Sequence, residues 1–140
     1  MNPTPDLQNE SYGPHERNVF DLWLAKSSRP TPLVLYIHGG GFKGGDKDSQ
    51  DPELLAEYLE SGISVAAINY RLSVLNNAPF PAAHLDSARA LQFLRHNGQN
   101  WNLDPDLVAA TGGSAGAGIS MWLGYHDDLA EPDSDDPVAR

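Results

Sequence analysis

The pentapeptide GGSAG at residues 112–116 constrains the fold of this chain more than any other segment. It is a G-x-S-x-G pattern that directly follows the apolar run of residues 107–110. Such a pattern places its serine on a sharp turn between a strand and a helix, where the two outer glycines leave room for a crowded backbone. The hydroxyl of Ser114 is then exposed at the end of the strand, beside the positive end of the helix dipole. The pattern therefore predicts an α/β fold with Ser114 as a nucleophile.

A second glycine motif, HGGG at residues 38–41, closes another apolar run at residues 33–37, upstream of the serine. An oxyanion hole needs two or more backbone N–H groups directed at one point, and glycines allow a loop to approach a substrate closely. The N–H of Ala115, directly after Ser114, is expected to form one arm of that hole. The two motifs in this order, each at the end of an expected strand, indicate a serine hydrolase.

On these motifs the chain resembles the N-terminal half of an α/β-hydrolase of the HGGG esterase and lipase group. The likeness runs from about Tyr12 to the C-terminus and includes NYRL at residues 69–72 and DSARAL at residues 86–91. Much of the lipase branch has DYRL where this chain has Asn69, which favours an acetyl or polysaccharide side-chain esterase over a long-chain lipase. The resemblance implies acyl-enzyme hydrolysis of a small ester, such as an acetylated or acylated sugar, with no metal and no cofactor.

The resemblance also implies roles for residues near Ser114. The N–H groups of Gly40 and Gly41 complete the oxyanion hole, and His38 and Gly39 orient the glycine loop. His38 stands in the wrong chain order for a triad base, since the acid and the histidine of an α/β-hydrolase follow the serine. The family carries both on later strands, which this chain does not contain. The expectation is an N-terminal portion of a catalytic domain with little activity of its own.

The order of apolar runs predicts one α/β domain over residues 1–140: a mostly parallel, doubly wound sheet with helices on both faces, in three αβα layers. Residues 1–18 are rich in proline, asparagine and charge, and are expected to be a loose lead-in. The acidic tail at residues 127–140 has no periodicity. Strands are expected at residues 19–24, 33–38, 63–69 and 107–111, and helices at residues 51–62, 81–97 and 115–126.

Composition excludes several classes of function. The net charge of −10 argues against a nucleic-acid partner, and the absence of cysteine excludes disulfides, a thiol nucleophile and thiolate metal sites. No apolar run reaches the roughly 18 residues of a membrane span, and the N-terminus lacks a secretory signal. The default expectation is a cytoplasmic protein with no membrane span, of undetermined oligomeric state.

Other titratable residues show no catalytic pattern. His126 lies about three helical turns, roughly 18 Å, beyond Ser114, too far for a hydrogen bond unless the helix breaks early. The acidic group in DSDDP at residues 133–137 lacks the later glycine and glutamate of a calcium loop and is expected to lie in solvent. The remaining histidines have no ligand spacing: His15, His84 and His96.

Two alternatives stay open. Residues Gly39 to Gly44 match G-x-G-x-x-G after a strand, as in a nucleotide-binding domain. A dinucleotide site, however, needs the motif to open a helix directly, with an acid about twenty residues further on. Here the next expected strand ends in Asn69. The other alternative is a catalytically inactive interaction module that retains half of the hydrolase fold.

Overall fold

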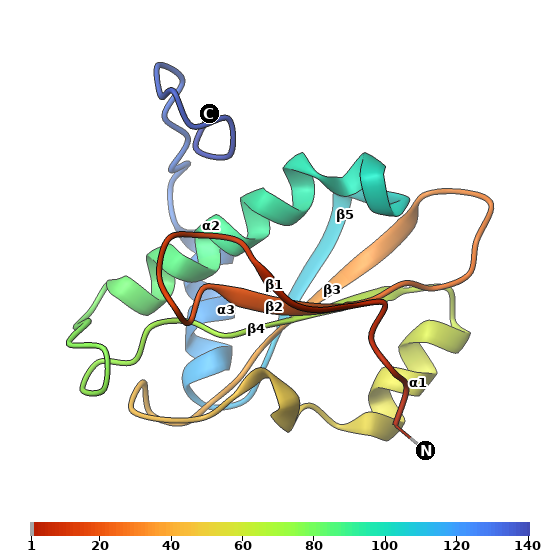
Figure 1. The fold of residues 1–140 in the computed structure, drawn as a ribbon, viewed down its shortest axis with the longest axis horizontal. Coiled ribbons are helices and arrows are strands. Elements are labelled where there is room, and N and C mark those ends of the chain that lie inside the picture. The colour runs from red at the N-terminus through yellow and green to blue at the C-terminus, as the bar shows by residue number, and fades with distance from the viewer. Residues whose placement is uncertain (1) are drawn as a thin grey trace.

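Five strands form one mixed sheet, in the order β1-β2-β4-β3-β5, in the computed structural model, which describes residues 2–140 (Figure 1). Strands β4, β3 and β5 run parallel, β2 pairs antiparallel with β4, and β1 pairs antiparallel with β2. The sheet confirms the predicted α/β class, but it is mixed, because β1 and the predicted strand β2 join it through two antiparallel pairings. The strands are β1 (Leu7–Ser11), β2 (Val19–Trp23), β3 (Thr31–Ile37), β4 (Ser64–Ile68) and β5 (Leu103–Thr111).

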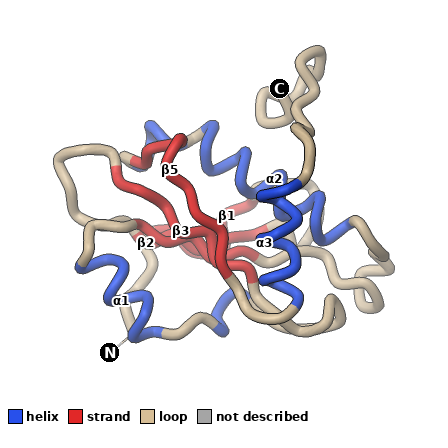
Figure 2. The backbone as a smooth tube through the Cα atoms, turned by 180° about the vertical axis from the view of Figure 1, so that it is seen from behind, coloured by secondary structure: helices blue, strands red, loops and turns tan. Residues whose placement is uncertain are grey.

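Helices cover both faces of the sheet, which gives the predicted three layers. Helix α1 (Pro52–Glu60) lies on one face, and α2 (Ala82–His96) and α3 (Ala115–Tyr125) lie on the other (Figure 2). Side chains alternate along a strand, so neighbouring positions of β3 serve the two faces. Leu35 packs in the core with α2 and α3, whereas Val34 packs in the core with α1. Two 3₁₀ helices complete the structure: η1 (Lys47–Ser49) and η2 (Gly98–Trp101).

The three helices begin and end within two residues of their predicted bounds, and for α1 the cap is visible in the sequence. Asp51 caps α1, and its carboxylate accepts a hydrogen bond from the N–H of Glu53 at 2.9 Å. Pro52 then occupies the first helical position, where a missing N–H costs nothing. Gly62, with φ of 78°, follows the end of that helix.

The expectation that residues 1–18 form a loose lead-in is wrong. Strand β1 pairs with β2, and the buried Tyr12 donates a hydrogen bond from its hydroxyl to the carbonyl of Asn69 at 2.5 Å. Burial raises the pKa of Tyr12 above its usual range. Strand β1 is polar because it is an edge strand whose side chains are mostly exposed. Strand β1 is ordered by its pairing with β2, and residues 7–11 carry no apolar pattern from which a strand could be predicted.

Strand β5 is longer than predicted and lies at the other edge of the sheet. It begins at Leu103, so that most of the expected connection at residues 101–106 is extended, and it tolerates Pro105 as edge strands do. Within residues 2–140 no strand pairs with its outer side, and the side chain of Leu107 is 54% exposed. An unpaired apolar edge of this kind invites pairing with another strand.

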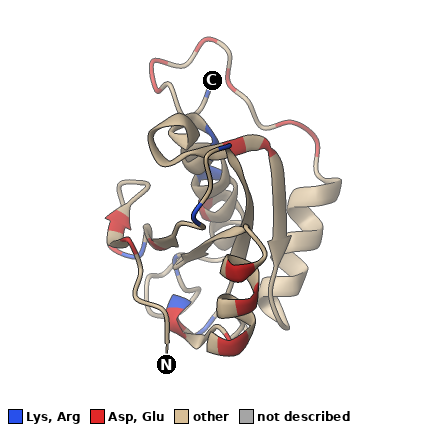
Figure 3. Ribbon diagram, turned by 90° about the vertical axis from the view of Figure 1, so that its right-hand side faces the viewer, with Lys and Arg blue, Asp and Glu red and all other residues tan. Residues whose placement is uncertain are grey.

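The C-terminal segment, residues 127–140, forms no helix or strand, but an ion pair ties it to α2. The guanidinium of Arg89 donates to Asp136, which lowers the pKa of that carboxyl. The expectation of a wholly solvent-facing acidic group is therefore wrong for Asp136, although Asp133 and Asp135 are exposed. Positions of Asp and Glu occur along this segment and in other parts of the ribbon (Figure 3).

Candidate active site

Ser114 lies on the turn between β5 and α3, at the end of the sheet where β3 also ends. Its backbone has φ of 53° and ψ of −117°, a region that residues other than glycine rarely enter. This strained turn is the conformation that the G-x-S-x-G pattern predicts. The side chain is exposed, and Oγ makes no hydrogen bond to any of residues 2–140. The hydroxyl is therefore free to meet a ligand.

The outer glycines of the pattern let this turn pack against the end of β3. A Cβ at position 116 would lie 2.8 Å from the carbonyl carbon of Ile37 and 2.9 Å from the carbonyl oxygen of His38. A Cβ at Gly112 would also collide with the carbonyl oxygen of Ile37. Because Gly112 and Gly116 have no side chains, the start of α3 can lie directly beside the residues that lead into the HGGG loop.

The HGGG loop lies against the Ser114 turn. A Cβ built on Gly39 would be 3.5 Å from the Cβ of Ser114, and Gly40 has φ of 122°, which favours glycine. The carbonyl of Gly40 accepts hydrogen bonds from the N–H groups of Lys43, at 3.0 Å, and Gly44, at 3.2 Å. The N–H groups of Gly40 and Gly41 donate to none of residues 2–140. The loop thus presents free donors close to an exposed serine.

Helix α3 brings a third free donor to the same place. Ala115 is the first residue of α3, where a backbone N–H has no partner within the helix. Its side chain is buried, so the start of the helix is held firmly against the sheet. Fixed N–H groups near a nucleophile are the arrangement that stabilises an oxyanion.

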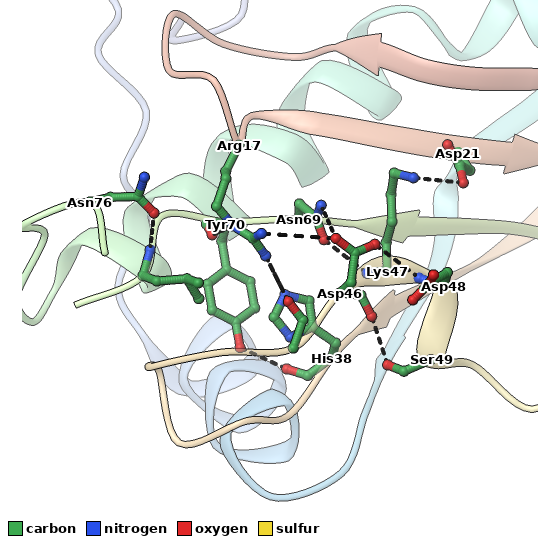
Figure 4. Close-up of polar contacts among 12 residues, drawn as sticks. Arg17, Asp21, His38, Asp46, Lys47, Asp48, Ser49, Asn69, Tyr70 and Asn76 are labelled. Atoms are coloured by element: carbon green, nitrogen blue, oxygen red, sulfur yellow. Dashed lines mark hydrogen bonds and ion pairs between the residues drawn. The ribbon is translucent and has the colours of Figure 1, made fainter. Parts of the chain in front are cut away.

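His38 is bound on both ring nitrogens and is not available to Ser114 (Figure 4). Its Nε2 lies 3.3 Å from Nη2 of Arg17, which only donates, so Nε2 accepts and Nδ1–H donates to the carbonyl of Gly39 at 2.6 Å. The ring stacks on Tyr70 with centroids 4.2 Å apart. Burial lowers the pKa of His38 and favours the neutral ring. These contacts fit the expected role of orienting the loop.

Arg17 is a site residue that the sequence patterns do not reveal. Its Nη2 donates to the carbonyl of Gly45 at 2.9 Å as well as to His38, and its Nε donates to the carbonyl of Tyr70 at 2.8 Å (Figure 4). One guanidinium therefore joins the two ends of the glycine loop to the end of β4. No sequence signal points to this role, because Arg17 lies in a polar segment without periodicity.

Asn69 fixes the far end of the glycine loop. Its amide donates to Asp46 at 2.9 Å and accepts from the N–H of Lys47 at 2.8 Å (Figure 4). Lys47 Nζ in turn lies 2.9 Å from Asp21 on β2, and both side chains are 7% exposed. An aspartate at position 69 could accept but not donate, and would repel Asp46. The asparagine is thus explained by loop anchoring, without reference to the substrate.

For the ester hydrolysis that the resemblance implies, measured in the full-length protein, we expect Arg17→Met to lower kcat/KM roughly tenfold or more, because small displacements of catalytic groups are costly. The substitution removes three hydrogen bonds, to His38, Gly45 and Tyr70, so the melting temperature should also fall. Steady-state kinetics and thermal denaturation measure the two effects. Arg29→Met, at an exposed turn, is the matched control. Unchanged kinetics in Arg17→Met would show that the guanidinium does not position the loop.

The remaining candidates from the sequence do not approach Ser114. Helix α3 is unbroken as far as Tyr125, so His126 stays at its far end, where Nδ1 contacts the carbonyl of Asp127. The Gly39–Gly44 loop does not open a helix directly, since α1 begins only at Pro52.

Residues 2–140 contain no group of three His, Asp or Glu residues placed to hold a metal ion. No helix in this part of the chain is long and apolar enough to cross a membrane.

Residues 20–137 match the BD-FAE family model. The matched segment contains β2 from its second residue, β3 to β5, all three α-helices and both glycine motifs. The chain belongs to the BD-FAE family. This result confirms the resemblance to α/β-hydrolase esterases that the two motifs indicate.

Curated relatives of this BD-FAE chain are esterases. Esterase LipQ of Mycobacterium tuberculosis (strain ATCC 25618 / H37Rv) is 33% identical over 127 residues, which are 86% of this chain and 30% of that protein. The probable carboxylic ester hydrolase LipM of the same strain is 36% identical over 114 residues, 79% of this chain and 26% of that protein. The chain thus spans less than a third of the length of these relatives.

Solved structures with the same fold are also esterases. An acetyl ester-xyloside bifunctional hydrolase from Caldicellulosiruptor lactoaceticus aligns with a TM-score of 0.75 and 30% identity, over 87% of this BD-FAE chain and 44% of that one. A truncated carbohydrate esterase from gut microbiota aligns with a TM-score of 0.81 and 25% identity, over 96% and 50%. The chain spans about half of these structures.

Proposed function

We propose that this chain carries the nucleophile and the oxyanion hole of a carboxylic-ester hydrolase. Ser114 is the nucleophile, and the N–H groups of Gly40, Gly41 and Ala115 bind the oxyanion. One observation carries the proposal: an exposed serine with a strained backbone and an unbonded hydroxyl lies against a glycine loop with free N–H groups. Membership of a family whose curated relatives are esterases supports it.

The reaction proceeds in two steps. A base takes the proton from Oγ of Ser114 while Oγ attacks the ester carbonyl, and the three N–H groups stabilise the resulting oxyanion. The C–O bond of the ester breaks, and the departing alcohol takes the proton from the base. Water then attacks the acyl-enzyme in the same way, which releases the acid and restores Ser114.

The base and the acid that orients it come, in this proposal, from a part of the esterase beyond these 140 residues. Both ring nitrogens of His38 are bound elsewhere, and His126 lies at the far end of α3. The relatives and solved structures are about two to three times as long as this chain. An inactive interaction module is the alternative, and the unpaired outer side of β5 within residues 2–140 is the feature that favours it.

The substrates are small esters, and an acylated sugar is the class that the neighbours favour. One similar structure is an acetyl ester-xyloside hydrolase and another is a carbohydrate esterase. The reaction proposed for this chain needs no metal or cofactor, since the serine, a base and backbone donors account for every proton and bond.

Turnover by the full-length esterase tests the proposal. We expect the protein to hydrolyse p-nitrophenyl acetate. When deacylation is slower than acylation, the acyl-enzyme accumulates, so the reaction should begin with a burst of p-nitrophenol equal to the enzyme concentration. A folded full-length protein that hydrolyses no ester would support the interaction module. Binding of NAD in calorimetry without esterase activity would instead support the nucleotide-binding alternative.

A further inference from the structure

His84 is a buried histidine that no part of the proposed mechanism uses. It lies in the first turn of α2 and is 8% exposed. Its ring centroid is 5.5 Å from that of Phe42, 5.0 Å from that of Phe80 and 5.2 Å from that of Trp122. Among residues 2–140, its Nδ1 is the one enclosed side-chain nitrogen or oxygen without a hydrogen-bond partner. Such an orphaned polar atom is costly and calls for an explanation.

A cavity of about 180 Å³ lies beside this histidine and beside the candidate oxyanion hole. Its lining includes Gly41 of the HGGG loop, the rings of Phe42 and Phe80, and His84 itself. Phe42 directly follows Gly41, so a group in the cavity is next to the loop that would hold the reacting carbonyl. The cavity is therefore placed to receive one end of an ester bound at Ser114.

The surroundings of His84 determine which ring nitrogen carries the proton. Burial lowers the pKa of His84, and a neutral imidazole has one N–H donor and one acceptor nitrogen. An enclosed N–H without a partner is rarer in proteins than an acceptor without one, so the proton belongs on Nε2. Nε2 makes no hydrogen bond within residues 2–140 and is not enclosed. Nε2 is therefore the ring nitrogen through which His84, a lining residue of the cavity, can donate to a ligand.

We propose that His84 determines substrate specificity: its Nε2–H donates a hydrogen bond to an oxygen atom of the substrate group that fills this cavity. Esters with a hydroxyl or ether oxygen at that point are then preferred over all-carbon analogues of the same length. The aromatic rings contact the C–H groups on either side of the oxygen. This inference rests on the proposed ester hydrolysis at Ser114. A site that donates to a substrate oxygen disfavours the analogue without it, because its own donor is left unpaired.

The test compares matched esters in which one CH₂ is replaced by oxygen, using the full-length esterase. On the acyl side the pair is p-nitrophenyl methoxyacetate and p-nitrophenyl butanoate. On the alcohol side it is 2-methoxyethyl acetate and butyl acetate. The measured quantity is the ratio of kcat/KM within each pair, and each variant is compared with the wild type so that the intrinsic reactivity of the esters cancels.

In His84→Leu we expect the ratio of one pair to fall roughly tenfold, the size of one hydrogen bond to substrate. His84→Gln keeps an N–H close to the position of Nε2 and should restore most of the ratio. His96→Leu, exposed at the end of the same helix, is the matched control and should leave both ratios unchanged. A purely structural role would lower kcat/KM for both members of a pair alike and leave the ratios constant.

The outcomes separate this inference from the proposed function. If the wild type hydrolyses the esters but both ratios are the same in His84→Leu, the specificity role of His84 is wrong and ester hydrolysis stands. A fall in one ratio that His84→Gln does not restore also contradicts the role of an N–H donor. If the folded wild type hydrolyses none of the four esters, the proposed function fails and this inference fails with it.

Discussion

Ser114→Ala is expected to abolish the proposed ester hydrolysis, with a loss in kcat of at least roughly a thousandfold in the full-length protein. Loss of the attacking oxygen removes the acyl-enzyme route and leaves only the effect of substrate binding beside the oxyanion hole. The side chain is exposed and makes no hydrogen bond within residues 2–140, so its removal should leave the melting temperature unchanged. Kinetics with p-nitrophenyl acetate and thermal denaturation measure the two quantities.

Ser28→Ala is the control for this experiment, because Ser28 is exposed in the turn before β3 and remote from both motifs in sequence. It should retain full activity. Turnover in Ser114→Ala within a few fold of the wild type would remove Ser114 as the nucleophile. A large fall in melting temperature would mean that the loss of activity reports unfolding instead.

The second large effect is expected at Gly116. In Gly116→Ala the new methyl group collides with the carbonyl of Ile37 at the end of β3, so the turn that carries Ser114 must shift. Overpacking of this kind costs about 1–3 kcal/mol of stability, and displacement of a nucleophile by about 1 Å can cost roughly a hundredfold in rate. The free energy of unfolding, measured by chemical denaturation, and kcat/KM should therefore both fall.

Helix α3 supplies its own control. Gly118 lies in the same helix, and a Cβ added there would have no atom within 4 Å, so Gly118→Ala meets open space. Alanine is a better helix former than glycine, and this variant should gain about 0.5–1 kcal/mol. If Gly116→Ala is as stable and active as Gly118→Ala, the conclusion that the Ser114 turn packs tightly against β3 is wrong.

The parts of the structure that sequence predicts are those with a local physical cause. The apolar runs of β3 and β4 are buried on both faces, as parallel central strands are, and the pattern around Ser114 predicts its strained turn. Helix α1 has a visible cap in Asp51 and Pro52, and α3 starts directly after the glycine pattern at Ser114. These bounds follow from residues close together in the chain.

The parts that could not be predicted depend on contacts between distant residues. Strand β1 is a polar edge strand whose order comes from β2, and Arg17 acquires its role only when the fold brings it to His38 and Gly45. His84 has no ligand spacing in the sequence, because its neighbours Phe42 and Trp122 come from other elements. Asn69 has a structural role that its place in the NYRL motif does not reveal, because its hydrogen bonds to Asp46 and Lys47 form only in the folded chain.

Covalent labelling of the full-length protein with a fluorophosphonate tests the proposed role of Ser114 most directly. Such reagents phosphonylate an activated serine, and mass spectrometry of the digested protein locates the adduct. We expect one adduct per molecule, on the peptide that contains Ser114, with loss of activity in proportion to labelling and protection by an ester substrate. An adduct on a different residue, or full activity in protein labelled at Ser114, would contradict the assignment of Ser114 as the nucleophile.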